Sequence, residues 1–189
     1  MSEVIRVLRA EHANIATLLK TLEAQVAVLE RGDEPDYDII RTAMDWFLSF
    51  PDVYHHPKED MVFARLQMRN PDAAATIGDL RHKHEELSYW SRTFAEGVRS
   101  VLNDAAVPRA ALVTWAQAYI NLQVEHMLME EQLLFPAAEA SLTDGDWQEL
   151  ETVMRSEEDP LFGDGVDAHF ERLRQMILRW QSHEESGAG

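Results

Sequence analysis

Four long stretches of this 189-residue chain carry apolar side chains at intervals of three and four residues, and this spacing constrains the fold most strongly. Side chains at such intervals share one face of an α-helix. The stretches run over residues 3–31, 37–69 and 71–104, and from 108 to a kink or end at Pro136. No segment alternates polar and apolar residues for long enough to form a strand. The pattern therefore predicts an all-α protein.

Short turns join these four predicted helices. Gly32-Asp33-Glu34-Pro35-Asp36 combines a helix stop with a helix start, and Asn70-Pro71-Asp72 does the same. Short connections place consecutive helices side by side and antiparallel, so we expect an up-down four-helix bundle over residues 1–140. Residues 141–189 then form a C-terminal helical extension packed on the bundle. It would hold a short helix near 146–157 and a last helix from about 166, with Val166, Phe170, Leu173, Ile177 and Trp180 on one face.

Helix-breaking residues inside the long stretches predict local irregularities. Pro51 and Pro57 remove backbone donors from the second helix, where we expect a kink or a short break. Gly78 and Gly97 should weaken the third helix only locally. In the fourth helix, the periodicity predicts an inward face made of Leu112, Trp115, Tyr119, Leu122 and Leu133.

Ionisable residues occupy positions on these apolar faces where an apolar residue is expected. They come from all four predicted helices, and counting 1.5 Å per residue from the short turns puts them at one level of the bundle. His55 and Glu59 share one helix face, as do His126 and Glu130, because each pair is four residues apart. The full set is His12, His55, Glu59, His84, His126 and Glu130.

A buried layer of this kind needs compensation, since an unpaired buried charge costs several kcal/mol. The chain has no cysteine, so a metal would take nitrogen and oxygen ligands. Imidazole and carboxylate together suit iron, manganese or zinc, and Glu59 and Glu130 could bridge two such ions. Two alternatives are a metal-free polar layer and a ferritin-like carboxylate site. The latter uses Glu-x-x-His pairs, whereas the order and spacing differ here.

The remaining histidines fit a ligand role less well. His56 lies about 100° from the inward face, so we expect it behind the ligands or at the surface, unless Pro57 rotates this region. His82 should face solvent. His169 and His183, in the C-terminal extension, are not expected to be ligands.

The histidine and glutamate pattern resembles the hemerythrin-like, HHE cation-binding family. That family has a histidine on helix one, His-x-x-x-Glu on helix two, a histidine on helix three and His-x-x-x-Glu on helix four. The matching segments are Glu11-His12, residues 50–63 around His55 and Glu59, His84-Glu85-Glu86-Leu87, and residues 126–136.

This resemblance implies a non-haem centre of two iron ions with an oxo or hydroxo bridge, and a small diatomic or peroxide ligand. Oxygen carriers of the family have a second histidine four residues along helix three, where this chain has Ser88, and an aspartate where it has Glu131. Tyr54 or Tyr119 could complete the coordination. The departures favour binding or sensing of O₂, nitric oxide or peroxide over oxygen carriage. Reduction of these molecules, iron handling or stress repair, and a regulatory bundle with a structural metal remain alternatives.

Composition limits the classes of partner that this chain is expected to bind. The formal charge of −17 disfavours nucleic acid, because phosphate binding requires basic surfaces. No apolar run reaches the length of a membrane span, and the first residues do not resemble a signal peptide. We therefore expect a cytoplasmic protein without membrane contact. The sequence does not indicate a protein partner or an oligomeric state.

Overall fold

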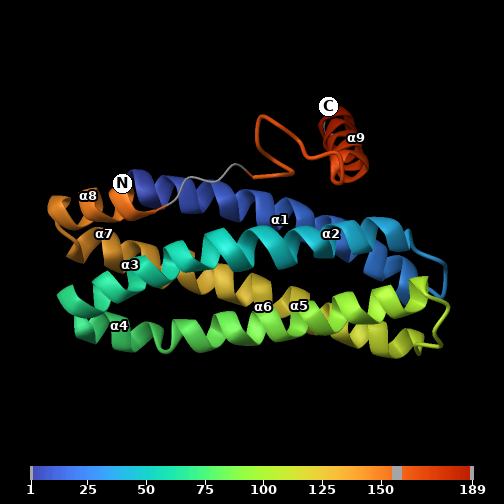
Figure 1. The fold of residues 1–189 in the computed structure, drawn as a ribbon, viewed down its shortest axis with the longest axis horizontal. Coiled ribbons are helices and arrows are strands. Elements are labelled where there is room, and N and C mark those ends of the chain that lie inside the picture. Colours follow the sequence, from blue (N-terminus) through green and yellow to red (C-terminus); the bar gives the residue numbers. More distant parts are fainter. Residues whose placement is uncertain (1, 155–158, 188–189) are drawn as a thin grey trace.

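The computed structural model describes residues 2–154 and 159–187. Four long helical segments run alternately up and down, side by side (Figure 1). The first is α1 (Glu3–Glu30), and the second joins α2 (Tyr37–Phe50), the π-helical turn η1 (Pro51–His55) and α3 (His56–Arg69). The third joins α4 (Pro71–Ile77) and α5 (Leu80–Leu102), and the fourth joins α6 (Arg109–Met129), the π-helical turn η2 (Glu130–Leu134) and α7 (Phe135–Ser141). The predicted all-α bundle is confirmed.

The prolines inside the second and fourth segments widen the helix without breaking it. Each π turn ends two residues before a proline, η1 before Pro57 and η2 before Pro136. A proline has no N–H, and its ring clashes with the carbonyl four residues earlier in a regular α-helix. The preceding turn therefore takes up a residue more, and the N–H groups of His56 and Phe135 bond to carbonyls five residues back.

The second π turn changes which residues of the fourth segment face the core. Leu133, which the α-helical spacing predicts to face inward, is 42% exposed, whereas Leu134 is fully buried. The prediction for Leu133 is wrong because it assumed an unbroken α-helical period through η2.

The two glycines of the third segment act differently. Gly78 has a φ of +85° and ends α4, and Asp79 then caps α5 by accepting a hydrogen bond from the His82 N–H. The expectation that Gly78 weakens the helix only locally is therefore wrong, because the helix divides there. Gly97 stays inside α5, where a Cβ would lie 2.7 Å from the Trp115 ring of α6, so a glycine lets these two helices approach closely.

Two apolar clusters fill the bundle, one on each side of the layer of ionisable residues. The larger one lies toward the α1–α2 and α5–α6 turns and includes Trp46, Phe47 and Phe94. The smaller one lies toward α4, α7 and α8 and includes Phe63, Leu134 and Phe135. These packed ends position the polar layer between them.

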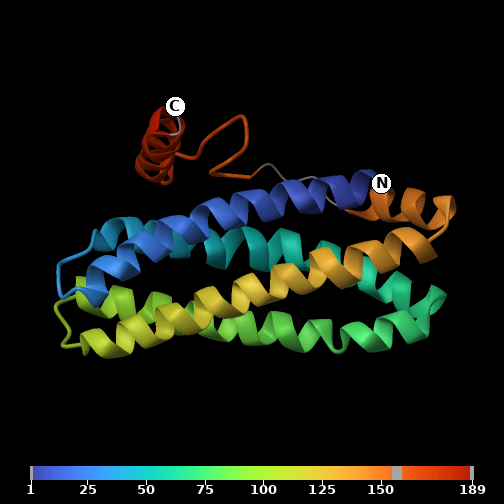
Figure 2. The ribbon, with the colours of Figure 1, turned by 180° about the vertical axis from the view of Figure 1, so that it is seen from behind.

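The C-terminal residues make two separate contacts with the bundle. Helix α8 (Asp144–Val153) packs against α1 and α3, and α9 (Glu171–Gly187) packs against α1 and α2, crossing them (Figures 1 and 2). The predicted helix over 146–157 extends into residues that lie outside the described part of the chain. The last helix begins later than residue 166, and the predicted inward side chain of Trp180 also lies outside the described residues, as does that of His183.

A buried aspartate anchors the chain between α8 and α9. Asp159 accepts hydrogen bonds from Trp46 Nε1 (2.8 Å) and Asn14 Nδ2 (3.3 Å), and from the N–H groups of Leu161 and Phe162. These contacts attach this part of the chain to α1 and α2. Within the described residues, none of the helices combines the length and apolarity that a membrane span requires.

The Asp146 carboxylate should account for much of the docking of α8. It caps α8 through Thr143 and accepts hydrogen bonds from Arg65 and Arg69, and Arg69 and Thr143 hold its pKa below the usual range. Replacing a cap and a charged acceptor together should lower the free energy of unfolding of the Asp146→Asn variant by about 1–3 kcal/mol in urea titrations. The exposed Asp144→Asn change is the control, and equal stability of the two variants would contradict this role.

Candidate metal centre

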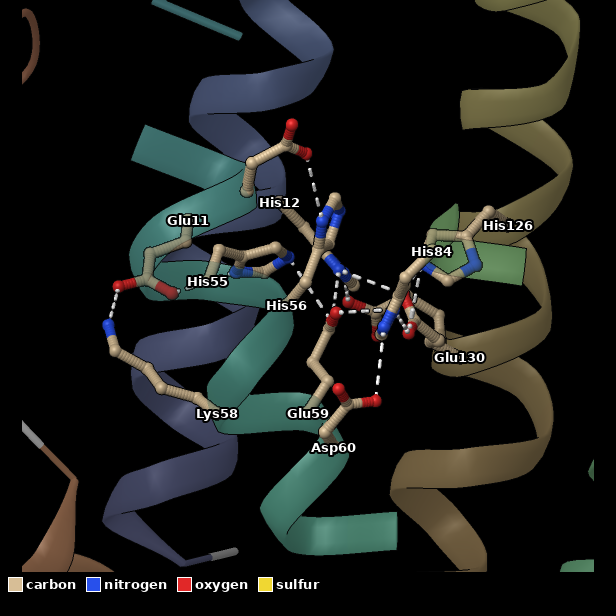
Figure 3. A network of polar contacts seen from close by, with 12 residues as sticks. Glu11, His12, His55, His56, Lys58, Glu59, Asp60, His84, His126 and Glu130 are labelled. Carbon is tan, nitrogen blue, oxygen red and sulfur yellow. Dashed lines mark hydrogen bonds and ion pairs between the residues drawn. The ribbon is translucent and has the colours of Figure 1, made fainter. Parts of the chain in front are cut away.

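The structure brings the six predicted site residues into one buried layer (Figure 3). His12 comes from α1, His84 from α5 and His126 from α6. His55 ends η1, Glu59 follows one turn later on α3, and Glu130 begins η2. The most exposed of the six is His84, at 7%. All four segments therefore contribute polar side chains to the same point in the bundle interior.

The two glutamates lie at the centre of this layer. Glu59 Oε1 is 3.1 Å from His12 Nε2 and 3.2 Å from His55 Nε2, while its Oε2 is 3.5 Å from His84 Nε2. Glu130 Oε2 is 3.4 Å from His12 Nε2, and its Oε1 is 3.2 Å from His126 Nε2. Each carboxylate thus presents one oxygen to each half of the layer, as a bridging ligand would.

His56 joins the layer, contrary to the expectation that it lies behind the ligands or at the surface. It is 5% exposed, and its ring stacks on that of His84 at a centroid distance of 4.4 Å. The physical reason is η1: successive side chains of a π turn are separated by a smaller angle than in an α-helix, so His55 and His56 both face inward. The position of Pro57 was the sequence signal for this change.

Two groups of residues in the described chain have the geometry to hold a metal ion. One comprises His56, Glu59, His84 and His126, and the other His12, His55 and Glu59, each with ligand atoms within 4.8 Å of one another. Glu59 belongs to both groups. Glu130 lies against both, through its contacts with His12, His84 and His126.

Unpaired polar atoms show that these residues fit a metal. Among the described residues, the Nε2 atoms of His55 and His56, Glu59 Oε2 and both oxygens of Glu130 are buried without a hydrogen-bond partner. Burying such atoms unpaired is costly, whereas each has a lone pair that a cation can take up. The unpaired atoms face the centre of the layer (Figure 3).

A second set of carboxylates holds the imidazoles in place through their Nδ1 atoms. Glu11 lies 2.8 Å from His55 Nδ1, Glu131 lies 3.0 Å from His12 Nδ1 and Asp60 lies 3.1 Å from His84 Nδ1. Asp52 lies 3.5 Å from His56 Nδ1, and Lys58 pairs with Glu11. Metal-binding histidines commonly have such partners, which direct the other ring nitrogen toward the metal.

Charges within the layer shift the pKa values of its histidine and glutamate side chains. Burial disfavours the charged form of His12, but Glu130 and Glu59 outweigh it and raise its pKa to about 11. Burial is likewise outweighed at His84, where Asp60 and Glu130 raise the pKa to about 11. Burial opposes ionisation of Glu59, but His55 and His12 hold its pKa well below the usual range. Burial and the nearby Glu59 raise the pKa of Glu130.

Of the three remaining imidazoles, His55 follows His12 and His84, because Glu59 and Glu11 outweigh its burial and raise its pKa. The other two behave in the opposite way. Burial lowers the pKa of His126 well below its usual value, and it also lowers the pKa of His56. In the absence of metal, the layer therefore holds protons on His12 and His84, while His56 and His126 are neutral.

The other candidate residues make different contacts. Tyr119 and Tyr54 pack against the rings of Phe47 and Phe50, at 5.4 and 5.8 Å. Glu131 pairs with His12 Nδ1 and with Arg9. The side chain of His82 is 74% exposed. His169, also exposed, pairs with Asp45.

Comparison with known proteins identifies the family. The family model described as the hemerythrin HHE cation binding domain matches residues 3–138. No match was found among curated proteins, and none among solved structures.

Metal binding should release protons. At pH 7, His12 and His84 carry protons in the metal-free chain because their pKa values are about 11, and both must lose them to bind a metal. We expect at least these two protons to be released, and the apparent affinity to rise with pH. Calorimetric titration with Mn²⁺ in buffers of different ionisation enthalpy, from pH 6 to 8, measures both quantities. A pH-independent affinity would contradict the proton assignments.

His56 should matter for metal retention although its spacing did not predict it. Removing one imidazole of a four-residue group should weaken metal affinity in His56→Ala by at least tenfold. The exposed His82→Ala variant should keep the metal of the unmodified chain. Metal content and affinity, measured on both variants after identical loading, test this difference. Equal retention would place His56 outside the ligand set.

Proposed function

Because the chain belongs to the hemerythrin HHE cation-binding family, we propose that it is a non-haem di-iron protein that binds or senses O₂, nitric oxide or peroxide. The observation that carries the proposal is the pair of ligand groups that share Glu59 and both contact Glu130. Imidazole and carboxylate donors suit iron, with manganese and zinc as competitors.

The donor positions suggest how the residues would divide between two ions. His12 and His55 would hold one ion, and His56, His84 and His126 the other. Glu59 and Glu130 would bridge them, because each presents one oxygen to either half. When bound, the ions would supply Lewis acidity and redox capacity.

The position of His56 also relates to a histidine that this chain lacks, the second histidine on helix three of the oxygen carriers. Ser88 stands four residues after His84 and donates a hydrogen bond to Asp52 at 3.1 Å. Asp52 in turn lies beside the Nδ1 atom of His56. We infer that His56 supplies the third imidazole of its group, which oxygen carriers of the family take from helix three.

The surroundings of His12 favour a small, weakly polar ligand. A groove between α1 and α6 reaches His12 and Glu131, and apolar side chains form most of its wall, including Ala13, Ala16 and Leu128. Arg9 and Glu131 pair at its polar edge. Diatomic molecules and peroxide are small enough to pass such a groove, and its largely apolar wall disfavours large charged metabolites.

The test combines metal content with an optical titration. The chain, produced in iron-replete cells without a metal-binding tag, should contain close to two irons, with a charge-transfer band that shifts when nitric oxide is added anaerobically. Glu130→Ala should lose bound iron, since it removes a proposed bridge, whereas the exposed Glu125→Ala should retain it. Full iron content in Glu130→Ala would show that the ligand set is wrong.

Measurements of turnover distinguish the three remaining candidate functions, which are binding or sensing, catalysis and a structural metal. Spectral changes with little turnover support binding or sensing. Repeated reduction of peroxide, O₂ or nitric oxide with an added reductant would instead assign an oxidoreductase. A metal that stabilises the fold without responding to any of these ligands would assign a structural role.

A further inference from the structure

The polar layer has different surroundings on its two sides. Toward α4 and α7, each segment places a fully buried aliphatic side chain in the adjacent turn; these are Leu8, Val62, Leu80 and Leu134. Toward the opposite end, the adjacent turns hold buried apolar side chains on α1 and α5, Ile15 and Leu87. They also carry polar residues: Asp52 on η1, Ser88 on α5 and Gln123 on α6. Asp52 and Ser88 bond to each other. Gln123 is the residue on this side that needs an explanation.

Gln123 lies on the inward face of α6 and is only 2% exposed. Tyr119 precedes it by four residues and His126 follows by three, and both are buried on the same face. Its Nε2 is buried without a hydrogen-bond partner among the described residues. The adjoining inward positions of α6 hold Leu112, Ala116 and Ile120, so a leucine or methionine would suit this position better by packing alone.

Gln123 also lies close to the layer along the axis of α6. Three residues of α-helix correspond to about 4.5 Å along the axis between Gln123 and His126. An amide nitrogen donates hydrogen bonds and does not coordinate a metal, so the unpaired group can serve a molecule bound at the ions.

We propose that Gln123 Nε2 donates a hydrogen bond to the small ligand that binds at the metal centre. This inference rests on the proposed function and adds the residue that recognises the ligand. The ligand class is a small molecule or anion with an exposed lone pair, such as azide, nitric oxide or peroxide. A buried amide that lacks a partner in the empty chain gains one when such a ligand is present, which favours polar ligands over purely apolar ones.

Azide titration of the iron-loaded chain tests this proposal. Gln123→Leu removes the donor at similar volume and should raise the azide dissociation constant about five- to tenfold at unchanged iron content. The infrared stretching frequency of bound azide should shift as well. Gln117→Leu is the matched control, because Gln117 lies on the same helix but is exposed, and it should bind azide as the unmodified chain does.

A second measurement separates ligand binding from packing. Since the substitution removes an unpaired buried donor, metal-free Gln123→Leu should unfold at a higher temperature than the metal-free unmodified chain. If leucine disturbs iron loading, Gln123→Met, which keeps an unbranched side chain, replaces it in both the azide titration and the unfolding measurement.

Equal azide affinity and frequency in the unmodified and Gln123 variants would overturn the role of Gln123 and leave the proposed function standing. If the unmodified chain holds two irons yet binds neither azide nor nitric oxide, both proposals fail.

Discussion

The structure depends on the presence of two buried carboxylates, Glu59 and Glu130, among five imidazoles in the middle of an apolar bundle. Such groups are costly to bury unless each is paired or bound to a metal. The outer carboxylates Glu11, Asp60 and Glu131 offset part of this cost by pairing with the Nδ1 atoms of three histidines. Nε2 of His55 and of His56, Oε2 of Glu59 and both oxygens of Glu130 lack a hydrogen-bond partner in the described chain, so a cation is the partner that best fits them.

The shape of the layer follows from two prolines. Pro57 and Pro136 each force a π turn in the helix before them, and these turns lie beside the polar layer. The first turn lets the adjacent residues His55 and His56 both face inward, which a regular α-helix would not allow. The second begins at Glu130 and shifts the following leucines, so that Leu134 packs beneath the layer. A local backbone irregularity thus sets how many side chains can offer a ligand atom to a metal.

Much of the fold and of the site could be predicted because both depend on helical periodicity. The inward positions of His12, His84 and His126 follow from spacings of three, four and seven residues. The periodicity failed where the backbone departs from the α-helix: at Gly78, where φ is positive, and at the π turns, where Leu133 and His56 change sides. The anchoring of Asp159 by Trp46 could not be predicted either, since it joins residues 113 positions apart.

Protons and metal ions are alternative ways to balance the same charges. In the metal-free chain, protons on His12 and His84 balance part of the negative charge of the glutamates. A bound metal replaces those protons and also satisfies Nε2 of His55 and His56. Neither protons nor metal satisfies Nε2 of Gln123, because this nitrogen is a hydrogen-bond donor. Its energetic cost therefore persists through metal loading and is offset only when a molecule with a free lone pair occupies the centre.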